Sequence, residues 1–211
     1  MTGLRESKKR RTREAIAQAA ADLFHEHGFA AVTVDDIARA ADVSRQTVFN
    51  YFPTKEQMLF DRDEEIRAAL LALVRGRPDG NSLVAAFRGH TRGFWQRFGR
   101  ILAGGGNTHG FWEIVEASPG LRDYAEASFA RHAISVGQEL AREWDRPSDD
   151  PLCHALARAL CGVNVAILTS GLGRLTAGED HATVVADMIE QADHAYDLVE
   201  RGLGRYTPVQ P

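Results

Sequence analysis

One short segment of the chain concentrates side chains that can form directional hydrogen bonds. It runs from Thr33 to Lys55 and reads TVDDIARAADVSRQTVFNYFPTK. Its centre carries hydroxyl, amide and guanidinium groups on Ser44, Arg45, Gln46, Thr47 and Asn50. Arginine pairs well with guanine, and glutamine or asparagine with adenine, for reasons of geometry. A set of this kind could read base edges in DNA.

Two short helices are expected to position these side chains. Thr33 with Asp36 three residues later is a capping-box-like start for the first helix. After a three-residue turn, Ser44 can cap the second helix, which Pro53 ends. An apolar underside and an exposed polar start are typical of a helix-turn-helix. The alternative is an amphipathic helical hairpin with a solvated polar face.

The first thirteen residues form a strongly basic segment. They carry a local charge of +5, although the formal charge of the whole chain is −4. A basic end on an acidic body suggests that DNA contact is confined to that end. We expect Lys9, Arg10 and Arg11 to contact phosphates or the minor groove. The alternative is a tail that only increases solubility.

The segment from about Arg10 to Leu59 resembles the DNA-binding signature of the TetR family of transcription regulators. The likeness includes the closing run Tyr51-Phe52-Pro53-Thr54-Lys55-Glu56. One departure is Tyr51, where many members have histidine. The resemblance implies that Thr33 anchors a phosphate, that Tyr51 and Lys55 clamp phosphates, and that the polar residues of the second helix face the major groove.

Helical spacing continues through the rest of the chain, and strand-like alternation is absent. We expect a helix from about Thr12 to His27 that Gly28 closes, and a long helix from Thr54 through Leu73. Five more helices are expected at about 82–102, 108–117, 119–145, 150–171 and 180–202. The fold class is therefore all-α with about nine helices. A three-helix helix-turn-helix domain would span residues 1–53, and a helical ligand-binding and dimerisation domain residues 54–211.

The middle helices are rich in aromatic residues, which suggests an apolar pocket with a few polar groups. The resemblance also implies a pocket here. The candidate ligand-binding residues are Trp95, Phe98, Asn107, Phe111, Trp112, Phe129 and Asn164. The alternative is that these residues are only the core of a bundle. His109 and Glu113, four residues apart, would be the candidates if the bundle were an enzyme, but no metal signature or cofactor motif accompanies them.

The last two helices have the composition of an interface between two copies of the chain. Within 150–171, one stripe is large and apolar, and a second stripe is small: Ala155, Ala159, Gly162, Ala166 and Ser170. Two stripes indicate burial on two sides, and two such helices suit a two-fold four-helix interface. The alternative is packing within one chain alone.

Cysteine content and hydropathy bear on location. Cys153 and Cys161 lie eight residues apart in one helix, about 12 Å along its axis and too far for a disulfide. We expect no apolar run to reach the length that spans a membrane, and therefore a cytoplasmic protein without a membrane partner.

Together these features predict a ligand-responsive transcription regulator. It would repress by binding a palindromic double-stranded DNA operator as a homodimer, and a small apolar or aromatic effector would release it. One alternative is an activator or architectural protein of the same fold without an effector. The other is the helical-bundle enzyme.

Overall fold

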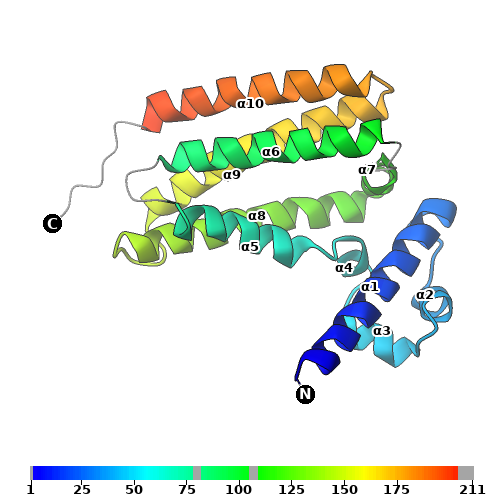
Figure 1. Ribbon diagram of the computed structural model, residues 1–211. Coiled ribbons are helices and arrows are strands. Elements are labelled where there is room, and N and C mark those ends of the chain that lie inside the picture. The colour runs from blue at the N-terminus through cyan, green and yellow to red at the C-terminus, as the bar shows by residue number, and fades with distance from the viewer. Residues whose placement is uncertain (1, 78–81, 105–108, 204–211) are drawn as a thin grey trace. The chain divides into compact units, whose positions relative to one another are not determined.

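The computed structural model describes residues 2–77, 82–104 and 109–203. These ranges contain ten helices and no strand, which confirms the all-α class. They form two compact units (Figure 1). The first unit comprises the described residues of 1–63 together with 110–125, and the second those of 64–109 and 126–211.

The first unit is built around the longest N-terminal helix. It contains α1 (Thr2–His27), α2 (Val34–Ala40), α3 (Arg45–Tyr51) and α4 (Glu56–Leu59). Most of α7 (His109–Glu116) and the start of α8 (Pro119–Glu143) belong to it as well. The side chains that hold α1, α2 and α3 together are fully buried: Ile16, Ala20, Phe24, Ile37, Val48 and Phe52.

Helix α1 begins earlier than the expected start near Thr12. It includes the basic residues from Lys8 to Arg13, which therefore lie on a helix continuous with the unit. The expected end is confirmed: Gly28 has φ 79°, and its N–H donates to the carbonyl of Phe24 at 2.9 Å.

The single helix expected from Thr54 to Leu73 is wrong. The chain forms α4 and then α5 (Asp63–Arg75), with a break at residues 60–62. Phe60 leaves the helical conformation with φ −96° and ψ 39°. At the break, the Arg13 guanidinium donates a hydrogen bond to the carbonyl of Asp61 at 3.2 Å. The division of one predicted helix into two raises the number from nine to ten.

The second unit is a helical bundle of α5, α6 (Leu83–Ala103), most of α8, α9 (Pro151–Thr176) and α10 (His181–Leu203). Helix α10 packs along both α6 and α9, as Figure 1 shows. Its core combines side chains from all five helices, including Leu71, Phe87, Leu140, Leu160 and Tyr196.

Ion pairs and one buried polar cluster fix α6 to its neighbours. Arg88 pairs with Asp197 at 2.7 Å, so α6 and α10 are joined at their surface. Inside the bundle, the Thr91 hydroxyl lies 3.2 Å from the Asn164 side-chain oxygen and 3.0 Å from the Tyr196 hydroxyl. Burial raises the pKa of Tyr196 to about 12, so this hydroxyl stays protonated and can donate.

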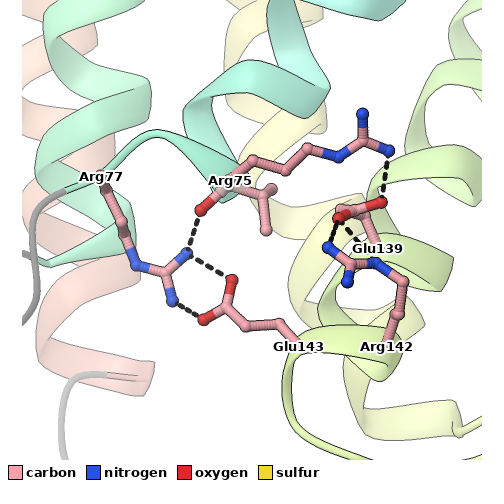
Figure 2. Close-up of polar contacts among 6 residues, drawn as sticks. Arg75, Arg77, Glu139, Arg142 and Glu143 are labelled. Atoms are coloured by element: carbon pink, nitrogen blue, oxygen red, sulfur yellow. Dashed lines mark hydrogen bonds and ion pairs between the residues drawn. The ribbon is translucent and has the colours of Figure 1, made fainter.

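A second group of charges joins α5 to α8 (Figure 2). The Glu139 side chain is only 7% exposed, and its carboxylate accepts hydrogen bonds from Arg75 at 2.7 Å and from Arg142. These bonds, with the Arg75 bond the largest cause, lower the pKa of Glu139 to about 2. Beside it, Arg77 pairs with Glu143 and donates to the carbonyl of Val74 at 2.9 Å. Two ion-pair sets therefore tie the end of α5 to α8.

Helix α9 requires a correction. Among the described residues it is the one helix long and apolar enough to span a membrane, by length and composition alone. The sequence pattern does not predict such a helix because Arg158 and Asn164 interrupt the apolar run. Only 28% of the apolar 18-residue stretch within α9 is buried inside the chain. The two cysteines on α9 are free, as expected, and both are buried.

Candidate nucleic-acid interface

The helix-turn-helix is built by local hydrogen bonds that the sequence predicts. Ser44 caps α3 by accepting from the N–H of Thr47 at 3.0 Å. In the turn before it, Asp42 adopts φ 53°, a left-handed conformation that aspartate tolerates better than most residues. Val48 and Phe52 are fully buried and hold α3 against the unit.

The opposite face of α3 is open to solvent. Arg45, Gln46 and Asn50 are exposed, together with the cap Ser44, whereas Thr47 and Tyr51 are half-buried. The Gln46 amide donates to the Asn50 side-chain oxygen at 3.1 Å, so the two amides form one row along the helix. The structure therefore brings the predicted base-reading side chains together on one short helix.

Arg45 is held by two neighbours. Its guanidinium pairs with Asp35 of α2 at 2.8 Å and lies 5.5 Å from the centre of the Phe49 ring. More than half of each side chain in the ion pair is exposed, so the pair itself contributes little stability. It orients Arg45 while leaving the guanidinium available to a stronger acceptor.

Thr33 forms the predicted capping box at the start of α2. Its hydroxyl accepts from the N–H of Asp36 at 3.2 Å, and its own N–H donates to the Asp36 carboxylate at 3.0 Å. The hydrogen bond from the Thr33 side chain is the main cause that lowers the pKa of Asp36. Thr33 is exposed at a helix N-terminus, which is where its phosphate contact is predicted.

Lys55 is engaged inside the unit. Its ammonium donates to the carbonyls of Phe29 at 2.6 Å and Val32 at 2.9 Å, and lies 4.2 Å from the centre of the Phe29 ring. Burial lowers the pKa of Lys55. The side chain therefore supports the turn between α1 and α2, and the predicted phosphate contact stays a prediction.

Arg13 has a role that the sequence did not reveal. Its guanidinium donates to the carbonyl of Tyr51 at 3.0 Å, lies 4.2 Å from the centre of the Phe52 ring, and also bonds the carbonyl of Asp61. It joins α1 to the end of α3 and to the break after α4. Its spacing of three from Ile16, on the buried face of α1, is the only signal that could have indicated this.

By contrast, Lys9, Arg10 and Arg11 are exposed.

Phe60, at the break after α4, is the centre of an aromatic cluster that was also missed. Its ring lies 5.3 Å from that of Phe111 on α7 and 4.9 Å from that of Tyr124 on α8. Phe111 in turn lies 5.1 Å from Trp112. Two predicted ligand-binding residues, Phe111 and Trp112, therefore belong to the same compact unit as the helix-turn-helix.

The other predicted ligand-binding residues that the structure describes lie in the second unit. Trp95 is buried and packs edge-on to Phe98 at 5.5 Å, and Phe129 is half-buried. Asn164 is part of the polar cluster with Thr91. Asn107 and the side chain of His109 fall outside the described residues, and Glu113 is exposed.

Comparison with known proteins agrees with this geometry. Residues 16–61 match the model of the family described as bacterial regulatory proteins, tetR family. The HTH-type transcriptional regulator TcmR of Streptomyces glaucescens is 33% identical over 146 residues, an alignment that covers 66% of this chain and 62% of TcmR. The chain therefore aligns with less than two thirds of that relative.

Two solved structures share the fold. Thermus thermophilus FadR, a TetR-family transcriptional repressor in complex with lauroyl-CoA, is 25% identical with a TM-score of 0.52, covering 94% of this chain and 98% of FadR. The SmeT–triclosan complex is 22% identical with a TM-score of 0.57, covering 95% of this chain and 96% of SmeT. The relatives are transcription regulators, which gives the enzyme alternative no support. The family match shows that residues 16–61 are a TetR-family domain, and the TcmR alignment extends the similarity to a transcriptional regulator over 146 residues.

Proposed function

We propose that the protein is a ligand-responsive transcriptional repressor that binds a palindromic operator as a homodimer in the cytoplasm. The observation that carries the DNA-binding part is the solvent-exposed face of α3. Three side chains that can form paired hydrogen bonds with bases, Arg45, Gln46 and Asn50, are exposed there, while Val48 and Phe52 hold the helix from behind. We call α3 the recognition helix, and assign DNA binding to residues 1–53 and effector binding with dimerisation to 54–211.

The exposed faces of α9 and α10 support a homodimer. The small-residue stripe on α9 is exposed at Ala155, Gly162, Ala166 and Ser170, although the helix is apolar overall. On α10, Leu198 is 71% exposed. Small residues let a second pair of helices approach closely, and a two-fold axis would place the same surface on both copies.

Dimerisation determines that the operator has two half-sites and sets the spacing between them. Two recognition helices related by a two-fold axis bind two half-sites, which lie about 34–36 Å apart for one helical turn of DNA or at multiples of that distance. A small change in the spacing between the recognition helices therefore prevents both from binding at once. An effector acts by favouring the spacing that does not fit.

The first compact unit offers a path from effector to DNA. Phe60 packs against Phe111 of α7 and Tyr124 of α8, and the carbonyl of the next residue, Asp61, is bonded by Arg13. Arg13 also bonds the last residue of the recognition helix. A shift of α7 would move Phe60 and, through Arg13, the end of α3.

Operator selection tests the DNA-binding proposal. The full-length protein is incubated with random duplexes, and bound DNA is amplified and sequenced. We expect an inverted repeat whose two halves are spaced by one helical turn or a multiple. The Gln46→Ala variant should bind that repeat more weakly and with relaxed preference at one base pair per half, at a cost of about 1–3 kcal/mol. A protein that retains no duplex would contradict the proposal.

A charge placed in the small-residue stripe tests the homodimer. Ala166→Arg buries an unpaired charge if a second copy covers α9, and should convert the dimer into monomers in light-scattering measurements. Gln138→Arg adds the same charge to the exposed face of α8 and serves as the matched control. Equal masses for both variants and the unmodified protein would show that α9 is not the interface.

Screening for raised melting temperature tests the effector. The panel consists of apolar and aromatic compounds and includes lauroyl-CoA, the ligand in the FadR structure. A compound that binds should also release the operator. Trp112→Ala should abolish that release while operator affinity stays nearly unchanged. If the variant releases the operator at the same compound concentration as the unmodified protein, the effector site lies elsewhere.

A further inference from the structure

The recognition helix exposes one aromatic side chain among its polar ones. Phe49 is 37% exposed, whereas Val48 beside it and Phe52 three residues on are fully buried. These two residues already fix α3 to the unit. An aromatic ring kept in water on the face that meets DNA gains most when a partner covers it.

Phe49 and Arg45 form one structural pair. They lie four residues apart on the same face of α3, with the guanidinium 5.5 Å from the centre of the ring. Asp35 holds the other side of that guanidinium at 2.8 Å. The pair runs beside the row formed by Gln46 and Asn50, so the exposed face carries one row of amides and one row that combines a cation with an apolar ring.

We propose that Phe49 contacts the C5 methyl group of a thymine in each operator half-site. This inference rests on the proposed function and specifies what the operator must contain. The major groove presents that methyl group as its apolar feature, and phenylalanine is one of the side chains that contact it. Four helical residues rise about 6 Å and one base-pair step about 3.4 Å. The thymine therefore lies within about two steps of the base that Arg45 contacts.

Replacing thymine by uracil isolates the methyl group, because base pairing and the other groove atoms are unchanged. Duplexes of the selected operator are made with uracil at each thymine position in turn, and affinity is measured by fluorescence anisotropy. At one position per half-site, uracil should weaken binding about fourfold, the change expected for one buried carbon group. Substitution in both half-sites should weaken it about fifteenfold, since two copies of Phe49 are affected.

Two variants assign the effect to a side chain. Phe49→Ala should bind the thymine and uracil duplexes equally, because the partner of the methyl group is gone. Asn50→Ala alters the neighbouring exposed residue and should retain the discrimination. Phe49 is exposed, so we expect the variant to fold, and equal melting temperatures check this.

Three results would overturn the inference while DNA binding itself stands. They are half-sites that contain no thymine, affinity that ignores every thymine-to-uracil change, and discrimination that survives in Phe49→Ala. The second result would also be obtained if the ring inserted between base pairs instead of touching a methyl group. If the unmodified protein binds none of the duplexes, the proposed function and this inference are both refuted.

Discussion

The cations of the N-terminal helix should separate into two kinds when the salt concentration is varied. Arg11 is exposed, whereas Arg13 donates to the carbonyls of Tyr51 and Asp61. The variants Arg11→Met and Arg13→Met each remove one charge per chain and keep most of the aliphatic stem. If Arg11 contacts a phosphate and Arg13 only positions the recognition helix, the first variant changes the salt dependence of binding and the second does not.

The expected change for Arg11→Met follows from counterion release. Each lost phosphate contact reduces the slope of log affinity against log salt by about 0.9, and a dimer loses two contacts, so the slope changes by about 1.8. Between 50 and 200 mM salt, the penalty of the variant relative to the unmodified protein should therefore shrink by roughly tenfold. Its melting temperature should stay nearly constant, because the side chain is exposed.

Arg13→Met should behave in the opposite way. It removes two hydrogen bonds of 3.0 and 3.2 Å from a charged donor and a guanidinium 4.2 Å from the Phe52 ring centre. Because these contacts are partly exposed, we expect a loss of about 2 kcal/mol in the free energy of unfolding. For a chain of this length that lowers the melting temperature by about 4–8 °C.

The assay is anisotropy titration of the selected operator at four or more salt concentrations, with thermal unfolding of each variant. Equal flattening of the slope by both variants would refute the division into two kinds of cation, as would an unchanged melting temperature for Arg13→Met. Lys55→Met belongs in the same series. Because Lys55 bonds the carbonyls of Phe29 and Val32, we expect it to follow Arg13. A flattened slope would instead support the phosphate clamp.

Three further predictions concern stability. Gly171→Ala should destabilise the protein by about 1–3 kcal/mol because the added methyl group would overlap the buried Trp95 ring. Gly89→Ala has open space around it and should stabilise the protein by about 0.5–1 kcal/mol. Denaturant titrations in which both variants change the stability in the same direction would contradict this. Glu139→Gln should cost about 1–2 kcal/mol at neutral pH. Because the pKa of Glu139 is about 2 in the folded protein and 4.5 ordinarily, that difference should be complete above about pH 5 and fade as the pH falls toward 2, and a cost independent of pH would exclude the ion pairs as its source. Thr33→Ala removes the cap of α2 and should cost about 1 kcal/mol in thermal unfolding, so a melting temperature equal to that of the unmodified protein would count against the capping box.

The features that the sequence predicted correctly depend on neighbours within four residues. The caps at Thr33 and Ser44 and the turn at Gly28 each use a partner three or four positions away. Short-range patterns of this kind are visible in a single sequence because the hydrogen bonds that satisfy helix ends are local.

The features that were missed depend on contacts between distant segments. Arg13 bonds residues 38 and 48 positions away, and Lys55 bonds residues 26 and 23 positions away. Phe60, at the break after α4, contacts Phe111 and Tyr124, which lie far along the chain. No local pattern distinguishes an arginine that bonds carbonyls from one that faces solvent. The sequence alone therefore groups Arg13 with the exposed cations of the basic segment.

Under the proposed function, Arg13 would also limit how an effector can act. Because one guanidinium bonds both the end of the recognition helix and the break after α4, these two places move together or the bonds are lost. DNA that held the recognition helix in place would therefore resist displacement of Phe60 and of Phe111 on α7, whose ring packs against it. The coupling must be reciprocal: the factor by which an effector weakens operator binding equals the factor by which the operator weakens effector binding.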